Sequence, residues 1–177
     1  MNILKKSYFS LSLLIILFLV SGEGRAQDAE KEANLKAVFL YNFTKYIDWP
    51  NLNSNQYFVV GIVGTTEITN ALNQIAKTYR VEGKKILILN FKKTDEISHC
   101  DLLFISGHSD IPVLSAVSQT GRGTLTVSEE SPGSSSGAAF NFIVKDDKLK
   151  FEASLKAINL TGLKISAQLL KLAILVD

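Results

Sequence analysis

Short apolar runs alternate with amphipathic segments through the middle of the chain. Four apolar runs bounded by polar stretches predict strands, and the β-branched and aromatic composition of the first predicts burial on both of its faces. These runs are Tyr57–Val63, Lys84–Phe91, Cys100–Ser106 and Gly123–Ser128. Apolar residues at helical spacing follow the first run from Ile68 to Ala76, and Pro112 opens a short helix after the third. This alternation predicts a parallel sheet with right-handed crossovers.

The pattern changes after the fourth run. The stretches "AAFNFIV" and "LKFEA" flank the polar segment Lys145–Lys148, whose length suits a hairpin between antiparallel strands. Apolar residues from Ile165 to Val176 keep helical spacing, and Gly162 interrupts this last segment, so two short helical pieces are expected there. The predicted fold class is α/β: a three-layer α/β/α sandwich with a mostly parallel sheet and a C-terminal antiparallel hairpin.

An aromatic-rich segment precedes the first strand. The stretch "KAVFLYNFTKYIDWP" (Lys36–Pro50) holds five aromatic residues in fifteen. At about 100° per residue, large apolar side chains gather on one arc and the remaining residues lie opposite. The apolar arc consists of Leu35, Val38, Phe39, Leu40, Phe43, Tyr46, Ile47 and Trp49, and the opposite arc of Ala37, Tyr41, Thr44, Lys45 and Asp48. Because Pro50 cannot continue the hydrogen-bond ladder, the helix is expected to end near Trp49 with its apolar arc buried.

The first residues have the order of a secretory signal peptide. Lys5 and Lys6 precede an apolar run from Leu11 to Val20, and Gly24-Arg25-Ala26 follows with small residues at the cleavage positions. A run of ten residues is shorter than the roughly 20 that a spanning helix needs. We expect a signal peptide over residues 1–26, cleaved after Ala26, and one domain over residues 27–177.

Cleavage also changes the charge balance. It removes Lys5, Lys6 and Arg25 from the 19 basic residues and Glu23 from the 17 acidic residues, which leaves 16 of each. The exported chain is formally neutral. The net charge of +2 on the full chain therefore gives no support to binding of nucleic acid or of an anionic membrane surface.

Residues with reactive side chains gather around the third predicted strand. Cys100 is the single cysteine of an exported chain, so it has no internal disulfide partner, and its place before "DLLFIS" predicts a buried, inert thiol. His99 and His108 lie at opposite ends of a strand that rises about 3.3 Å per residue, too far apart to share a zinc ion. Ser106 lacks the Gly-x-Ser-x-Gly turn of a hydrolase nucleophile. We assign no catalytic, metal-binding or cofactor-binding residue.

The turns after the first and third strands favour a different kind of site. The stretch "VGIVGTT" matches neither a Gly-x-Gly-x-x-Gly fingerprint nor a Walker loop. In an open parallel sheet, however, the carboxyl ends of the strands border a crevice in which small molecules bind. The candidate crevice residues are Gly64, Thr65, Thr66, Gly107 and His108.

Several stretches resemble the YfiR family and occur in that family's order. The stretches "LKAVFLYNFTKYIDWP" and "FEASLKAINLTGLKISAQLLKLA" are similar to its opening and closing signatures. "CDLLFIS" resembles its central Cys-x-x-Leu-Phe-Ile strand, and "LTVSE" with "AAFNFIVKDDKLKFE" is similar to its later strands. The resemblance covers about residues 32–175, so the domain over residues 27–177 is identified as YfiR-like.

The resemblance implies a periplasmic, non-enzymatic regulator without a cofactor. The best-understood members of the family are homodimers that bind the periplasmic region of a membrane diguanylate cyclase and repress it, and an outer-membrane lipoprotein can sequester the repressor. Release of the cyclase raises cyclic-di-GMP and favours biofilm. Members that use disulfides need a partner for the cysteine matched by Cys100, which this chain lacks; an intermolecular bond through Cys100 stays open.

Tyr41 and Trp49 are the candidate residues for a surface that meets a partner or a second copy. Tyr41 lies on the polar arc and Trp49 at the helix end, and such aromatic side chains are enriched in interfaces. In the alternative, Tyr41 is merely exposed and Trp49 is buried. The competing functional hypothesis is a small-molecule sensor that uses the crevice. A hydrolase with Ser106 or Cys100 as its nucleophile ranks below both.

Overall fold

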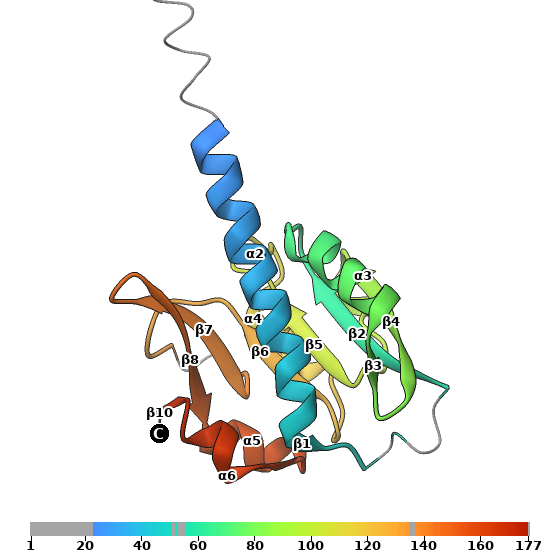
Figure 1. Ribbon diagram of the computed structural model, residues 1–177. Helices are drawn as coiled ribbons and strands as arrows, with labels where there is room; N and C mark the ends of the chain where they lie inside the picture. Colours follow the sequence, from blue (N-terminus) through green and yellow to red (C-terminus); the bar gives the residue numbers. More distant parts are fainter. Residues whose placement is uncertain (1–22, 51, 53–55, 135–136, 177) are drawn as a thin grey trace, which may run out of the picture.

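The computed structural model describes residues 23–50, 52, 56–134 and 137–176, and its α/β architecture is the predicted one (Figure 1). Within these residues, eight strands form one sheet in the order β10-β8-β7-β6-β5-β2-β4-β3. Their bounds are β2 Tyr57–Val63, β3 Arg80–Val81, β4 Lys84–Phe91, β5 Leu102–Ile105, β6 Leu125–Ser128, β7 Phe140–Lys145, β8 Lys148–Ser154 and β10 Ile174–Val176. Strands β4, β2, β5, β6 and β7 pair in parallel, so the mostly parallel sheet is confirmed.

The predicted hairpin is formed by β7 and β8, which pair antiparallel from Phe140↔Ala153 to Lys145↔Lys148. Asp146 and Asp147 make its two-residue turn with φ of 54° and 55°. Left-handed backbone at both central residues matches the right-handed twist of the strands, and Asp tolerates this conformation better than most residues.

The two faces of the sheet are covered by different helices. Alternate residues of β2 point to opposite sides, as its pleat requires. Phe58, Val60 and Ile62 join the large core cluster with α2 (Glu23–Phe43) and α3 (Ile68–Thr78). Val63 belongs to a smaller cluster on the other face, where α4 (Val113–Ser118) contributes Ala116. The three predicted layers follow from this division.

The aromatic helix ends earlier than predicted. Helix α2 stops at Phe43 and continues as the 3₁₀-helix η1 (Thr44–Tyr46) and the short strand β1 (Ile47–Asp48). Strand β1 pairs antiparallel with β9 (Lys164–Ile165), and the Tyr46 carbonyl accepts the Ser166 N–H at 2.9 Å. Backbone pairing with a segment far along the chain thus satisfies the peptide groups that a longer helix would have bonded internally.

The buried face of α2 is also turned relative to the predicted arc. Leu40 and Phe43 are buried as expected, but Ala37 and Thr44, predicted to face solvent, are buried too. Leu35 and Val38, predicted to be buried, are exposed. Small side chains such as Ala37 let a helix approach its neighbours closely, and α2 packs on both α3 and the sheet. Close packing therefore rotates the helix away from its most hydrophobic arc.

The C-terminal segment contains the two predicted helical pieces and two strands that were not predicted. The helices are α5 (Leu155–Thr161) and α6 (Ala167–Leu170), and Gly162, with φ of 70°, ends α5 in the left-handed conformation. Strand β9 lies between the two helices, and β10 follows α6 and joins the sheet edge parallel to β8. The helical spacing from Ile165 to Val176 did not reveal these pairings.

The predicted signal segment falls largely on residues that the structure does not describe. Its last four residues, 23–26, form the first turn of α2, and cleavage after Ala26 stays a prediction. Of the helices in the described ranges, none has both the length and the apolar composition that crossing a membrane requires.

Candidate functional site

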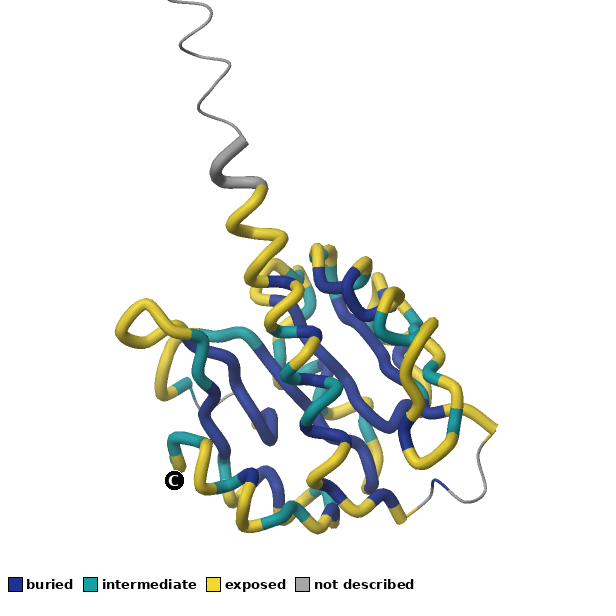
Figure 2. Tube along the Cα trace, in the orientation of Figure 1, coloured by how far each residue is buried: buried dark blue, intermediate teal, exposed yellow. Residues whose placement is uncertain are grey.

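The outward side of α2 and η1 carries large apolar side chains that remain exposed or half-buried. Leu35 is 45 % exposed, Val38 46 % and, in η1, Tyr46 40 %. Phe39 lies beside them, is half-buried and packs on the core; its ring meets Phe142 of the hairpin edge-on, with the ring centroids 6.0 Å apart. In Figure 2, exposed and buried residues alternate along α2, and residues 27–32 are all exposed. We call Leu35, Val38, Phe39 and Tyr46 the α2 surface.

Tyr41 does not belong to this surface, because it is half-buried on another side of α2. Its ring lies 4.9 Å from the ring of Tyr79, and its hydroxyl donates to the Arg80 carbonyl at 3.4 Å. The ammonium of Lys45 lies 4.5 Å above the Tyr41 ring. These contacts join α2 to the segment between α3 and β3, so Tyr41 contributes to the packing of the domain.

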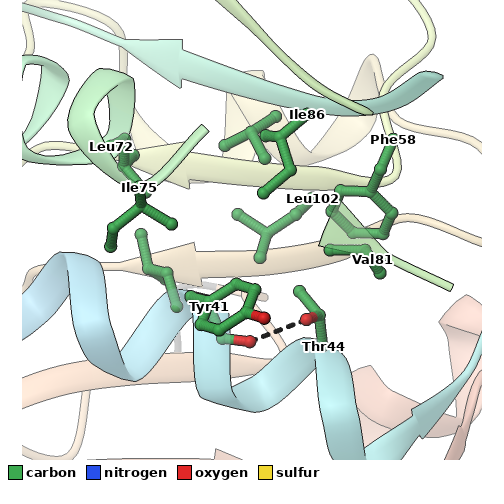
Figure 3. Close-up of a pocket in the computed structure, with 10 residues that line it drawn as sticks. Tyr41, Thr44, Phe58, Leu72, Ile75, Val81, Ile86 and Leu102 are labelled. Atoms are coloured by element: carbon green, nitrogen blue, oxygen red, sulfur yellow. Dashed lines mark hydrogen bonds between the residues drawn. The ribbon is translucent and has the colours of Figure 1, made fainter. Parts of the chain in front are cut away.

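Tyr41 also covers a small apolar void between α2 and the sheet (Figure 3). Leu72 and Ile75 of α3 and Phe58 and Leu102 of the sheet line the void. Its volume of about 10 Å³ is near the minimum for one water molecule, and a water needs polar partners that these side chains lack. The void is therefore a packing gap, too small for a ligand.

Trp49 is buried, so its prediction as a surface residue is wrong; the alternative holds for Trp49 but not for Tyr41, which is half-buried rather than merely exposed. The side chain is 8 % exposed. Its Nε1–H donates to the Thr44 carbonyl at 3.0 Å, and its ring meets Phe58 edge-on at 4.9 Å. The hydrogen bond satisfies the indole and stabilises the turn that follows α2.

The predicted crevice exists in part at the carboxyl ends of the parallel strands. Thr65, Thr66 and His108 line a cleft of about 340 Å³. Gly64 and Gly107 do not line it. A Cβ at residue 64 would lie 2.8 Å from the Ser109 Cβ, and a Cβ at residue 107 the same distance from the Glu129 carbonyl oxygen. Both glycines are thus required for close backbone packing beneath the cleft.

Three charged residues that sequence reasoning missed also line this cleft. Lys36 and Glu32 come from α2, and Glu129 follows β6. The Lys36 ammonium lies 2.6 Å from Glu129 Oε1 and 2.5 Å from Glu32 Oε1. Burial alone lowers the pKa of Lys36, but hydrogen bonds and charge interactions with Glu129 and Glu32 outweigh it, so the pKa is raised. The other Glu129 oxygen accepts the Gly107 N–H at 3.0 Å, which ties α2 to the sheet edge.

The reactive residues of the third predicted strand are held in structural roles. Cys100 is 1 % exposed, and burial, followed by the charge of Asp101, raises the pKa of its thiol to about 12. The Ser106 hydroxyl donates to the Thr65 carbonyl at 3.4 Å and accepts the His108 N–H at 3.2 Å. Across the described ranges, no three His, Cys, Asp or Glu side chains are placed to hold a metal ion.

The comparison with known proteins identifies a family. The model of a family described as YfiR/HmsC-like matches residues 33–174, which include all the strands and helices described above except the amino-terminal turns of α2 and the end of β10. No curated protein matches the chain. The matched range contains the α2 surface, Cys100 and most of the cleft, whose lining residue Glu32 lies just before it.

Proposed function

Because the chain belongs to the YfiR/HmsC-like family, whose members are regulators in cyclic-di-GMP signalling rather than enzymes, we propose that it represses a membrane-bound diguanylate cyclase. The repressor is exported after cleavage of residues 1–26 and acts in the periplasm as a homodimer. It binds the periplasmic region of the cyclase, and an outer-membrane lipoprotein sequesters it when repression is relieved.

The α2 surface carries this proposal, because it offers apolar side chains for a partner protein. Single exposed apolar residues are ordinary on soluble domains, whereas a contiguous group on one helix is typical of a contact surface. Leu35, Val38 and Phe39 lie three and four residues apart and therefore on one helical face. A partner that covers them removes large apolar side chains from water without disturbing the core.

Repression sets an energetic condition on this contact. The repressor must bind the inactive state of the cyclase more tightly than the active state, because equal affinity for both states leaves the equilibrium between them unchanged. Turning a cyclase from 99:1 active to 1:99 requires about a 10⁴-fold difference in affinity. A surface with several large apolar side chains suits this demand better than isolated surface ion pairs, which are worth about 0–1 kcal/mol each.

The experiment measures intracellular cyclic-di-GMP in a strain that lacks the gene. The strain is complemented with the full chain, with a version lacking residues 1–26, or with Val38→Asp. Leu172→Asp is the matched control, because Leu172 is 73 % exposed and lies outside the α2 surface. We expect cyclic-di-GMP to rise on deletion and to fall again only with the exported full chain and the Leu172 variant.

Two results would contradict the proposal. The first is unchanged cyclic-di-GMP after deletion under several growth conditions, which would favour the ligand-sensing hypothesis for the cleft or a partner outside this pathway. The second is full repression by Val38→Asp at an unchanged protein level, which would exclude the α2 surface. Crosslinking of the functional complex then identifies the partner.

A further inference from the structure

A second cleft, away from the α2 surface and from the carboxyl ends of the strands, has the chemistry of an anion site. It lies between the end of α4, the start of β6 and helix α5, and its volume is about 250 Å³. We call it the Arg122 pocket. Val117, Ala157 and Leu160 supply apolar lining, and Thr126 and Arg122 supply polar groups.

Arg122 is the one charged residue among the described residues that line this pocket. Within the described chain, the structure gives its guanidinium neither a hydrogen bond nor an ion pair. Arg122 is exposed, and its guanidinium lies close to the backbone of Gly162, since a Cβ at residue 162 would be 2.6 Å from Arg122 Nη2. An arginine without a carboxylate partner is suited to binding an anion.

Thr126 supplies a second donor. The residue is 2 % exposed, and its hydroxyl oxygen accepts the Ala139 N–H at 2.9 Å. In the part of the chain that the structure describes, its own proton has no acceptor. The other two lining threonines differ, since the hydroxyls of Thr120 and Thr161 each donate to a backbone carbonyl at 2.7 Å. A buried hydroxyl with an uncommitted proton beside a cation favours a ligand that accepts hydrogen bonds.

We propose that the Arg122 pocket binds a small organic carboxylate with a short apolar group. The carboxylate accepts from the Arg122 guanidinium and the Thr126 hydroxyl, and the apolar group packs against Val117, Ala157 and Leu160. The volume is near the lower end for small-molecule sites, which restricts the ligand to a compact acid. This binding activity goes beyond the proposed repression of a cyclase and does not depend on it.

A purely structural role for Arg122 makes different predictions. The guanidinium lies near the carboxyl end of α5, where a positive charge is favourable. In that case, removal of the charge lowers stability, and neither the unchanged protein nor the variant binds a ligand in this pocket. Lys156 is an exposed cation on the same helix and does not line the pocket, so Lys156→Gln is the matched control for charge removal.

The test is a titration of the purified, isotope-labelled full chain with sodium hexanoate, followed by amide chemical shifts. Hexylamine and hexan-1-ol serve as probes of the same length without the carboxylate. We expect saturable shifts around Arg122 and α5 with hexanoate alone. Arg122→Gln should weaken binding about tenfold or more, since a charge-assisted hydrogen bond is lost. Arg122→Lys should retain part of the affinity, and Lys156→Gln all of it.

Thr126 provides an independent arm. Thr126→Ser keeps the hydroxyl and should bind hexanoate as the unchanged protein does, whereas Thr126→Val removes the donor and should bind several-fold more weakly. Folding of each variant is checked by its amide spectrum without ligand. The proposal is overturned if hexanoate gives no saturable shift, if hexan-1-ol binds equally well, or if Arg122→Gln binds with unchanged affinity.

Discussion

Replacing Glu129 by Gln tests what holds α2 against the carboxyl edge of the sheet. Glu129 and Glu32 both contact the Lys36 ammonium at nearly the same distance, but their surroundings differ. The Glu129 side chain is 16 % exposed, as is Lys36, whereas Glu32 is 48 % exposed. Glu129 also accepts from the Gly107 N–H, so it is the carboxylate that joins two parts of the chain.

The expected losses follow from this difference in burial. A hydrogen bond to a charged group contributes about 1.5–3 kcal/mol, and Glu129→Gln should cost about 1.5 kcal/mol because the amide oxygen still accepts from Gly107. An exposed helical pair at i and i+4 contributes about 0.3–0.5 kcal/mol, so Glu32→Gln should cost no more than that. The ratio of the two losses, about three or more, is the quantity to measure.

Urea unfolding followed by tryptophan fluorescence provides the assay. Trp49 is the single tryptophan and is buried against Phe58, so its emission reports exposure of the core. With a slope of about 1–3 kcal/mol per molar urea, a loss of 1.5 kcal/mol moves the midpoint by roughly 0.5–1.5 M. Equal losses in Glu129→Gln and Glu32→Gln would refute the idea that the buried carboxylate holds α2 in place.

Three further predictions concern Cys100, Tyr41 and Lys36. Native Cys100 should react with iodoacetamide at least 100-fold more slowly than the unfolded chain, as followed by mass spectrometry, since the thiolate is rare at neutral pH and buried; rapid native labelling would contradict this. Tyr41→Ala should lower the free energy of unfolding by about 2 kcal/mol, roughly half the cost for a fully buried aromatic residue. Tyr41→Phe should lower it by much less. An unchanged free energy of unfolding in Tyr41→Ala would show that the contacts of Tyr41 do not stabilise the fold. Because the pKa of Lys36 is raised in the folded state, its stabilisation is complete below pH 10.5 and is lost as the pH rises through the folded pKa. The stability difference between the unchanged protein and Lys36→Met should therefore shrink above pH 10.5 in urea titrations. A difference that grows there would contradict a pKa of Lys36 that is raised on folding.

The burial of Cys100 also answers a question that the sequence left open. A thiol that is 1 % exposed and belongs to the smaller core cluster cannot meet a second molecule while the domain is folded. An intermolecular disulfide would require opening of that cluster. Non-reducing electrophoresis of the native protein should therefore show no disulfide-linked dimer.

Local patterns were sufficient to predict the longer strands, the hairpin and the layers, but not the short strands β1, β3, β9 and β10. The runs Tyr57–Val63 and Lys84–Phe91 are strands with the predicted bounds. Tyr57–Val63 was recognisable because side chains buried on both faces of a sheet must nearly all be apolar; Lys84–Phe91 is apolar too, although of its residues only Phe91 is buried. The hairpin was recognisable because the short polar segment Lys145–Lys148 separates two apolar runs; the structure then assigned its turn to Asp146 and Asp147. These features depend on residues that are close together along the chain.

Only the tertiary structure decided which side of α2 faces the core and which side groups are brought together. Helical periodicity located the segment, but it favoured the arc with Leu35 and Val38, whereas close packing against α3 and the sheet favours the side with Ala37. The end of α2 depends on pairing with β9, and the charged bridge joins Lys36 to Glu129 from distant segments. The amino-acid sequence by itself thus determined the main elements and the α/β fold class, because these follow from local burial and turn chemistry. Contacts between distant residues depend on how the layers pack, and no local pattern contains that information.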